Sequence, residues 1–441
     1  MIDTNSREIV LDILMEILEK GNLSHLILKQ ALEKYQYLEK QDRAFITRIT
    51  EGTLEYLIQI DAVINRYSKV KVNKMKPVIR TIMRMSVYQL LYMERVPDSA
   101  VCNEAVKLAK KRKFQGLTGF VNGVLRNISR EKGVLEFKSS AERYSIPQWM
   151  FSLWEKNYGI EIAEKISASF LEDRAVTVRC NLSKASVAEI VSSLKNQEIQ
   201  VEESSLSPVM LHLKGYDYMD AVEAFSEGLI TVQDVSSSLV GMAASPKPGD
   251  FVLDVCSAPG GKSMHAADMM NGTGVVESRD LTEYKISLVE ENILRCGFTN
   301  MRTKVWDATV FDPEMKGKAD IVIADLPCSG LGIIGKKPDI KMRLREEELE
   351  ELSALQKKIL KVVSGYVKPG GVLVYSTCTI NPGENEENAS WIEANLPFKK
   401  KEIASAMPEV LKNDCVENRI QLLPGIHPCD GFFIAAFERE R

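Results

Sequence analysis

The sequence predicts a multidomain protein in which an all-helical domain and a small α+β domain precede a doubly wound α/β domain. The chain has 441 residues, whereas an ordinary domain has about 100–200. Apolar residues recur at helical spacing up to about residue 130. Beyond residue 246, short apolar runs alternate with helical stretches. This alternation is typical of a mostly parallel sheet with helices on both faces.

The composition excludes several other classes of protein. The apolar fraction of 45% and the charged fraction of 27% are those of a globular chain. No run of about 18 apolar residues predicts a membrane span, and the polar N-terminus does not resemble a signal peptide, so we expect a cytoplasmic protein. The 8 cysteines include no Cys-x-x-Cys pair, and only 4 histidines accompany them. A zinc site is therefore not expected.

Residues 1–135 are predicted to form the helical domain. An apolar stripe at helical spacing begins at Ile9. Pro77 is expected at a helix start, where its missing N–H costs nothing. The apolar side chains of the helix that follows are predicted to be buried, which leaves Arg80 and Arg84 on another face.

The charge of the chain is unevenly distributed. Residues 1–130 hold 22 Lys and Arg against 14 Asp and Glu, and the remaining residues hold 35 against 47. Within the first part, residues 61–130 alone carry 15 against 4. A basic module joined to an acidic body suggests that one part binds a polyanion for the other to process. Charge alone does not separate this interpretation from a set of solvated helix faces.

Residues 140–235 are predicted to form a small α+β connecting domain after a polar linker. A strand is expected at 176–181, a helix at 185–195, and extended segments near 199–203 and 209–213. Periodicity assigns no chemistry to this domain.

Residues 236–441 are predicted to form the doubly wound domain. Buried strands are expected at 251–256, 274–280, 301–306, 319–325 and 371–376, and helices at 262–270, 283–295 and 346–365. Ligands in such a sheet bind at the carboxyl ends of the strands. The chemically suggestive residues of this domain all follow predicted strands.

A glycine-rich loop follows the first of these strands. It consists of Cys256, Ser257, Ala258, Pro259, Gly260, Gly261 and Lys262. Paired glycines let the backbone approach a ligand closely, and the following helix start offers free N–H groups. The loop fits the adenosylmethionine site of a methyltransferase. A phosphate-binding P-loop is the alternative, although Cys256 occupies its first glycine position. A turn without a ligand is the third interpretation.

Two aspartates follow the next two strands. Asp280 is placed where an acid can accept hydrogen bonds from the ribose hydroxyls of a nucleotide cofactor, and Asp307 suits an adenine amino group. Each alone could equally be a helix cap or a turn aspartate. Their positions at successive strand ends favour a cofactor site.

Two thiols follow the last two strands. Asp325-Leu-Pro-Cys328 ends one strand, and Ser-Thr-Cys378 ends the other. Two thiols at neighbouring strand ends, with Asp325 and Lys262 nearby, predict covalent catalysis. Small buried residues are the alternative interpretation, since inert burial is the common fate of cysteine.

These motifs resemble those of the Sun family of RNA 5-methylcytosine methyltransferases. The shared motifs are Asp-x-Cys-x-Ala-Pro-Gly-Gly-Lys at 254–262, Asp-x-Pro-Cys-Ser-Gly at 325–330 and Thr-Cys-Thr at 377–379. Ser257 and Leu326 stand where the family usually has alanine. Both changes lie beside backbone-mediated contacts, so the expected activity is the same.

The N-terminal part resembles the NusB-type antitermination domain, an all-helical RNA-binding module. The resemblance covers about residues 5–130 and is strongest in Asn-Glu-Ala-Val-Lys-Leu-Ala-Lys at 103–110 and Phe-Val-Asn-Gly-Val-Leu-Arg at 120–126. Together the two resemblances imply a monomeric enzyme that transfers a methyl group from S-adenosylmethionine to carbon 5 of a cytosine in 16S rRNA. A tRNA cytosine methyltransferase, a non-catalytic NusB-like RNA-binding factor and a P-loop ATPase are the alternatives.

The family resemblance also implies a role for each site residue. Carbon 5 of cytosine is too electron-poor to accept a methyl group until a thiolate adds at carbon 6. Cys378 is implied as that nucleophile, with Lys262 as the cation that favours its thiolate. Asp325 would hydrogen-bond the ring N3 and the amino group, and Cys328 would remove the carbon 5 proton and release the enzyme. The cofactor is implied to bind the loop from Cys256 to Lys262, together with Asp280, Asp307 and Asp325. The target base must be unstacked to reach this site.

Overall fold

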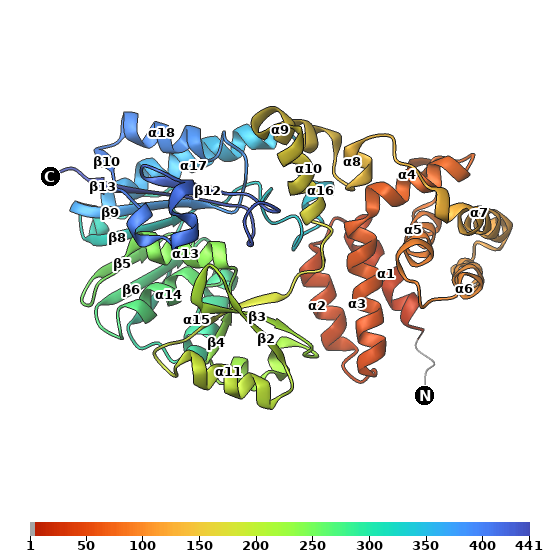
Figure 1. Cartoon of the computed structure of the whole chain (residues 1–441), viewed down its shortest axis with the longest axis horizontal. Helices are drawn as coiled ribbons and strands as arrows, with labels where there is room; N and C mark the ends of the chain where they lie inside the picture. The colour runs from red at the N-terminus through yellow and green to blue at the C-terminus, as the bar shows by residue number, and fades with distance from the viewer. Residues whose placement is uncertain (1–4) are drawn as a thin grey trace. The chain divides into compact units, whose positions relative to one another are not determined.

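The computed structural model describes residues 5–441, which divide into two compact units (Figure 1). The first unit extends to Glu172 and also includes Ile334–Leu344. The second consists of Asp173–Ile333 and Arg345–Arg441. The described part of the first unit is helical, and both β-sheets lie in the second. The predicted fold class, with helical, α+β and α/β parts in this order, is confirmed.

Two helices of the first unit begin at residues that favour a helix start. The Asn5 side chain accepts a hydrogen bond from the N–H of Arg7 and caps the first helix, and Pro77 occupies the first turn of another. The helices are α1 (Ser6–Leu18), α2 (Ser24–Lys34), α3 (Lys40–Glu55), α4 (Leu57–Tyr67), α5 (Pro77–Tyr92), α6 (Asp98–Lys111), α7 (Thr118–Glu131), α8 (Ser140–Arg143), α9 (Gln148–Tyr158), α10 (Ile160–Ser169) and α16 (Ile340–Arg343).

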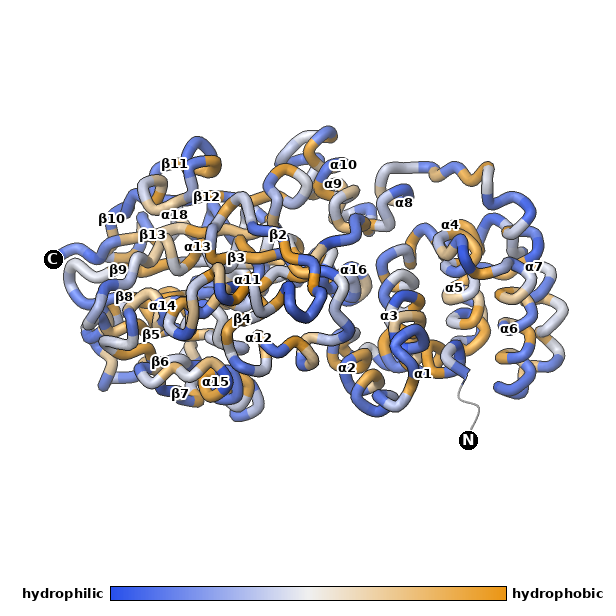
Figure 2. Tube along the Cα trace, turned by 60° about the horizontal axis from the view of Figure 1, so that its bottom comes forward, coloured by the Kyte–Doolittle hydropathy of each residue, from blue (hydrophilic) through white to orange (hydrophobic). Residues whose placement is uncertain are grey.

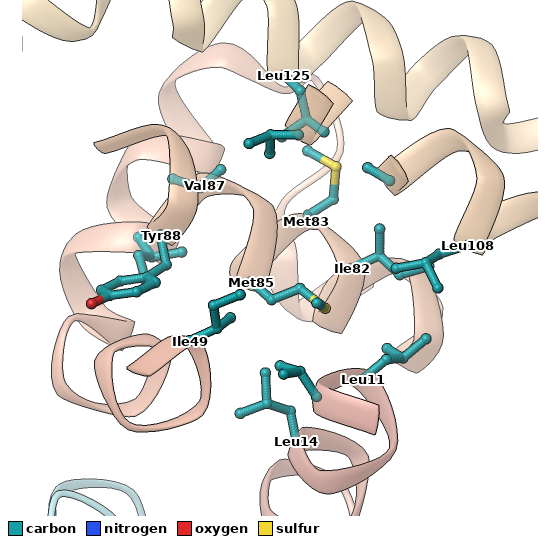
Figure 3. Packing of buried hydrophobic residues seen from close by; sticks show 14 of the residues in the cluster. Leu11, Leu14, Ile49, Ile82, Met83, Met85, Val87, Tyr88, Leu108 and Leu125 are labelled. Carbon is teal, nitrogen blue, oxygen red and sulfur yellow. The ribbon is translucent and has the colours of Figure 1, made fainter. Parts of the chain in front are cut away.

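The core of this unit gathers around α5. Met83 and Met85 of α5 are fully buried and pack among apolar side chains of the surrounding helices (Figure 3). A Cβ on Gly52 of α3 would lie 2.0 Å from the Tyr88 ring, so only glycine admits this close packing of α3 against α5. Both hydrophobic and hydrophilic residues occur along α1 and α3 (Figure 2), as one-sided burial of a helix requires, whereas α5 is buried on most of its surface.

The basic residues of α5 do not point freely into solvent. The Arg80 guanidinium forms a two-fold ion pair with Glu19, and Arg84 Nη2 lies 2.6 Å from Asp61 Oδ2. The prediction that Arg80 and Arg84 lie off the buried face is compatible with this arrangement. However, carboxylates of the same unit neutralise both guanidinium groups.

One segment of the first unit comes from far along the chain. Helix α16 contributes Lys341, whose Nζ donates to the backbone carbonyl of Glu55 at 2.6 Å, and burial lowers the Lys341 pKa to about 7. Asp339 accepts a hydrogen bond of 2.7 Å from Ser24 Oγ, and Met342 packs against the helical core. The segment is thus tied to the helical unit by buried contacts.

The second unit begins with a small antiparallel sheet in the order β2-β3-β1-β4. Ser186 and Glu189 form a capping box at the start of α11 (Val187–Asn196), which packs beside this sheet. The strands are β1 (Val176–Cys180), β2 (Gln200–Ser204), β3 (Ser207–Lys214) and β4 (Ile230–Val232). The three longer strands match the predicted extended segments, and β4 is an addition.

The large sheet has the order β11-β12-β13-β9-β8-β5-β6-β7, and β10 pairs with β13. The parallel part consists of β5 (Phe251–Asp254), β6 (Val275–Asp280), β7 (Met301–Val305), β8 (Ala319–Asp325) and β9 (Val367–Thr377). The antiparallel part consists of β10 (Phe398–Lys400), β11 (Cys415–Val416), β12 (Arg419–Leu422) and β13 (Phe432–Arg439). The antiparallel part lies beyond the last strand that the sequence predicts.

The strand order places a switch point at β5. From β5 the chain proceeds to β6 and β7 on one side, then continues with β8 and β9 on the other. A crevice for a ligand opens at such a point, outside the carboxyl ends of the strands. The helices of the unit are α12 (Glu223–Ser226), α13 (Val235–Ala244), α14 (Gly261–Met269), α15 (Glu283–Cys296), α17 (Glu348–Val363) and α18 (Glu386–Asn395), in addition to α11.

Candidate active site

The glycine-rich loop connects β5 to α14 at the switch point. Gly260 has φ +102° and precedes the first residue of α14. A Cβ on Gly260 would lie 3.2 Å from Val289 Cγ1, so the backbone and the available space both favour glycine here. Ser257 Oγ is buried and has no hydrogen-bond partner among the described residues. The loop therefore holds one hydroxyl whose hydrogen bond a ligand can complete.

Asp254 fixes the two ends of this loop. Its carboxylate accepts a hydrogen bond of 2.6 Å from Ser263 Oγ in the first turn of α14. Burial raises the pKa of Asp254 to about 7, against the lowering effect of the Ser263 hydrogen bond and of Lys262. Cys256 lies in the same loop, and burial raises the pKa of its thiol, so it is not activated as a nucleophile.

Of the two strand-end aspartates, the structure joins Asp280 to the loop and leaves Asp307 apart. Asp280 Oδ2 accepts from the N–H of Ala258 at 3.0 Å, and Oδ1 lies 3.0 Å from Lys285 Nζ. Asp307 is exposed and accepts two hydrogen bonds of 2.8 Å from Thr309, one of which, from the backbone, is the main cause lowering its pKa. Asp307 here has the form of a turn aspartate, and its role toward a cofactor stays a prediction.

Lys262 and Asp325 form an ion pair across the crevice. Their Nζ and Oδ2 atoms are 2.7 Å apart, with side chains 15% and 23% exposed. Asp325 also accepts a hydrogen bond of 2.9 Å from Ser376 Oγ on the neighbouring strand β9. Burial alone would lower the pKa of Lys262, but Asp325, Asp254 and Cys378 together raise it, so the ammonium is retained.

The two predicted cysteines lie side by side. Cys328 follows β8, Cys378 follows β9, and their Sγ atoms are 3.3 Å apart. The hydrogen bond with Cys378 raises the pKa of Cys328 well above its usual range, and burial adds to this effect. The parallel register of β8 and β9 produces this proximity, because it sets Asp325 opposite Ser376.

Behind the thiols lies a set of buried polar residues that the sequence did not single out. Glu384, on the loop before α18, accepts hydrogen bonds from Ser329 and Gln356. Asn385 accepts from Thr377 Oγ1 and donates to the carbonyl of Thr379. The only signal in the sequence is the polar run Asn-Pro-Gly-Glu-Asn-Glu at 381–386, which by itself reads as an exposed turn.

Four lysines are exposed on one connection of the helical unit. Lys69, Lys71, Lys74 and Lys76 lie between α4 and α5, and no ion pair holds them among the described residues. Some other basic residues of 61–130 are neutralised locally, such as Lys111, which lies 2.5 Å from Glu8, whereas others, such as Lys110 and Lys113, are exposed as well. The four lysines are therefore one part of the charge excess that is available to a polyanion.

Residues 5–441 contain neither a candidate metal site nor a candidate membrane-spanning helix. Their His, Cys, Asp and Glu side chains nowhere gather into a group of three or more that could hold a metal ion. None of their helices is long and apolar enough to cross a membrane.

Sequence models of three families match successive parts of the chain. The NusB family matches residues 4–130, the ferredoxin-like domain of RsmF/B-like methyltransferases matches residues 146–217, and 16S rRNA methyltransferase RsmB/F matches residues 241–438. The order of the matches is the order of the parts described above.

Full-length relatives are similar to the whole chain. Probable ribosomal RNA small subunit methyltransferase B of Bacillus subtilis (strain 168) is 35% identical, and the match covers 100% of both chains. The protein of the same description from Synechocystis sp. is 31% identical, with 99% of each chain covered. The solved structure of PH0851 is 27% identical and superposes with a TM-score of 0.83 over 99% of this chain and 100% of that one.

Proposed function

Because this chain belongs to the RsmB/F family of 16S rRNA methyltransferases, we propose that it transfers a methyl group from S-adenosylmethionine to carbon 5 of a cytosine in 16S rRNA. The observation that carries the proposal is the pair of thiols 3.3 Å apart beside the Lys262–Asp325 ion pair. A non-catalytic RNA-binding factor has no use for this arrangement. Membership in a methyltransferase family also removes the P-loop ATPase.

The residues at the switch point fit the cofactor. Ser257 Oγ lacks a partner, Gly260 brings backbone close to the crevice, and the first N–H groups of α14 face the same loop. Asp280 would accept from the ribose hydroxyls, and the loop from Cys256 to Lys262 would hold the amino acid end. When bound, S-adenosylmethionine supplies an activated methyl group.

Cys378 is the nucleophile in this proposal. The negative charges of Glu384 and Asp325 add to the effects that keep the proton on Cys328. Asp325 is the main cause that raises the pKa of the Lys262 ammonium, and Cys378 adds to it, so a cation is available to the Cys378 thiolate. The proton between the two sulfurs therefore belongs to Cys328, which donates it toward a Cys378 thiolate. That thiolate adds to carbon 6 of the cytosine and makes carbon 5 nucleophilic.

Asp325 and Cys328 complete the sequence of steps. Asp325 would accept a hydrogen bond from the amino group of the base and, in its protonated form, donate to N3 as negative charge reaches the ring. Once the Cys378 sulfur is bonded to carbon 6, the S–H···S hydrogen bond that held the Cys328 proton no longer exists. Once carbon 5 carries the methyl group, Cys328, having released its own proton to water, would take the proton from carbon 5, and Cys378 would leave as a thiolate.

The helical unit is proposed to hold the RNA. Lysines contact phosphates without reading sequence, so this unit would add affinity while the crevice selects the base. The target cytosine must leave its stack, as other enzymes that modify bases require.

The function is tested by incubating the purified chain with methyl-labelled S-adenosylmethionine and unmethylated 16S rRNA, then analysing nucleosides by mass spectrometry. The expected product is 5-methylcytidine at one position, absent when tRNA replaces 16S rRNA. Label in another nucleoside contradicts the proposed chemistry, and 5-methylcytidine in tRNA alone favours the tRNA alternative.

A further inference from the structure

Glu384 is a fully buried carboxylate next to the two thiols. It accepts four hydrogen bonds, from Ser329 N at 2.9 Å, Ser329 Oγ at 2.5 Å, Gln356 Nε2 at 3.0 Å and Asn381 Nδ2 at 3.1 Å. All four donors are neutral. Within residues 5–441 no Lys, Arg or His forms an ion pair with it, so neutral donors alone satisfy its buried oxygens.

The hydrogen bonds of Glu384 join the two cysteine loops. Ser329 directly follows Cys328, and Asn381 lies three residues beyond Cys378. Thr379, the neighbour of Cys378, donates through Oγ1 to Ser329 Oγ at 2.7 Å, because the Ser329 hydroxyl proton is used on Glu384. Gly332 N adds a bond of 3.1 Å to the Cys378 carbonyl. The carboxylate thus braces both loops from behind the thiols.

Charged groups act differently on the two thiols. The hydrogen bond with Cys378 and burial raise the pKa of Cys328 most, and the charges of Glu384 and Asp325 add to this effect. Lys262 interacts with Cys378 as well as with Asp325. Tyr375 donates a hydrogen bond to the Glu384 carbonyl, but burial raises the pKa of its hydroxyl well above the usual range, so it stays neutral. Anionic groups therefore act on Cys328 and a cation acts on Cys378.

We propose that Glu384 is a positioning residue that aligns the two thiols and keeps Cys328 protonated, so that Cys378 alone attacks the base. This inference rests on the proposed thiol chemistry and assigns it a residue that touches neither substrate nor cofactor. In the proposed reaction, Glu384 would prevent Cys328 from competing as a nucleophile, and would make its later thiolate a stronger base.

The experiment measures thiol reactivity in the full chain without RNA or cofactor. Iodoacetamide alkylates thiolates, so the pH dependence of alkylation at each cysteine, followed by peptide mass spectrometry, reports its ionisation. Wild-type Cys328 is expected to react only at higher pH than Cys378. Glu384→Gln keeps the volume and removes the charge, and should speed Cys328 alkylation at pH 8 about tenfold. Exposed Glu387 lies three residues away on α18, and Glu387→Gln should leave both profiles unchanged.

A second variant separates charge from shape. Glu384→Asp retains a charge but withdraws the carboxylate, so Cys328 should stay slow toward iodoacetamide while methyl transfer falls at least tenfold. Unchanged Cys328 alkylation in Glu384→Gln overturns the inference. So does an equal acceleration at every cysteine of that variant, which signals loosened packing only. Alkylation needs no RNA, so the inference about Glu384 can hold even if the chain forms no 5-methylcytidine. Conversely, the chain can form 5-methylcytidine while Glu384→Gln leaves Cys328 alkylation unchanged.

Discussion

Lysine and arginine side chains of the helical unit lie mostly at its surface, whereas the sheet unit buries several of its charged groups. Lys111 of the helical unit is 62% exposed while it pairs with Glu8, but Arg179 and Asp268 of the sheet unit pair at 2.9 Å with side chains 1% and 6% exposed. A surface pair contributes at most about 1 kcal/mol, and breaking a buried pair costs about 3–5 kcal/mol. The helical unit therefore keeps most of its charge in contact with solvent, where it is available to a partner, and the sheet unit uses buried charge to fix a geometry.

The largest expected effect lies at the thiols, where the buried polar set meets the substrate. Cys378→Ala should reduce methyl transfer by about 10³-fold or more, because no thiolate remains to activate the base. Cofactor affinity, measured by calorimetry, should survive, since the glycine-rich loop belongs to another strand.

Cys328→Ala is the matched variant. It should still form the adduct and transfer the methyl group, then stall with RNA attached, visible as a slow band on a denaturing gel. The double variant should lose the band. A band with Cys378→Ala and none with Cys328→Ala reverses the two roles.

The second effect concerns the buried pair of Arg179 and Asp268. Asp268 also accepts hydrogen bonds from Ser183 N and Ser183 Oγ, so its carboxylate ties the start of the small domain to helix α14. Asp268→Asn should lower the free energy of unfolding of the sheet unit by about 3–5 kcal/mol, because the Arg179 charge is left buried. Denaturant unfolding measures this, and Glu104→Gln, at the surface pair with Lys107, should cost less than about 1 kcal/mol. Equal losses in both variants would remove the contrast between the units.

The third effect is a pH dependence confined to the sheet unit. Burial, aided by the Arg179 charge, lowers the pKa of His265 to about 3, below its unfolded value of about 6.5. The unfolded chain therefore binds the proton first, and stability present above pH 6.5 is lost as pH falls toward 3. At pH 4.5 the loss due to His265 is about 2–3 kcal/mol. His265→Gln should flatten this part of the stability profile, and an unchanged slope would locate the acid sensitivity elsewhere.

The smallest effect belongs to the surface lysines. Replacing Lys69, Lys71, Lys74 and Lys76 by glutamine should weaken binding to 16S rRNA about tenfold to a hundredfold at moderate salt. Each lost phosphate contact should also reduce the slope of log K against log salt by about 0.7–0.9. Filter binding at several salt concentrations measures both quantities. Melting temperature should hardly change, and affinity equal to wild type would move the RNA surface to another face.

The elements nearest the site were predictable because each has a local signature. The strands near the site begin as short apolar runs, and the structure has strands at three of the predicted places, β5, β6 and β8, although β5 ends at Asp254 instead of Cys256. The pairing of Cys328 with Cys378 follows from strand order alone. It needed no side-chain detail.

The residues that brace the site could not be predicted in this way. Glu384 is buried by partners such as Ser329, 55 positions earlier, and a carboxylate in a Gly-Glu-Asn run otherwise reads as solvated. Arg179 likewise depends on Asp268, 89 positions later. Asp307 is a different case, because a local pattern existed but was ambiguous. Its position after a strand predicted a cofactor contact and a turn equally well, and the structure has the turn, with a hydrogen bond from Thr309. Long-range partners decide these cases, and no local pattern encodes them.

The segment Ile334–Leu344 determines how the protein can be cut into separate fragments. The backbone leaves the sheet unit at Glu172/Asp173 and again at both ends of this segment, so three covalent crossings join the units instead of one linker. Deleting residues up to 130 would remove the partners of Lys341 and Met342. The segment would then expose a lysine and an apolar side chain close in sequence to Cys328.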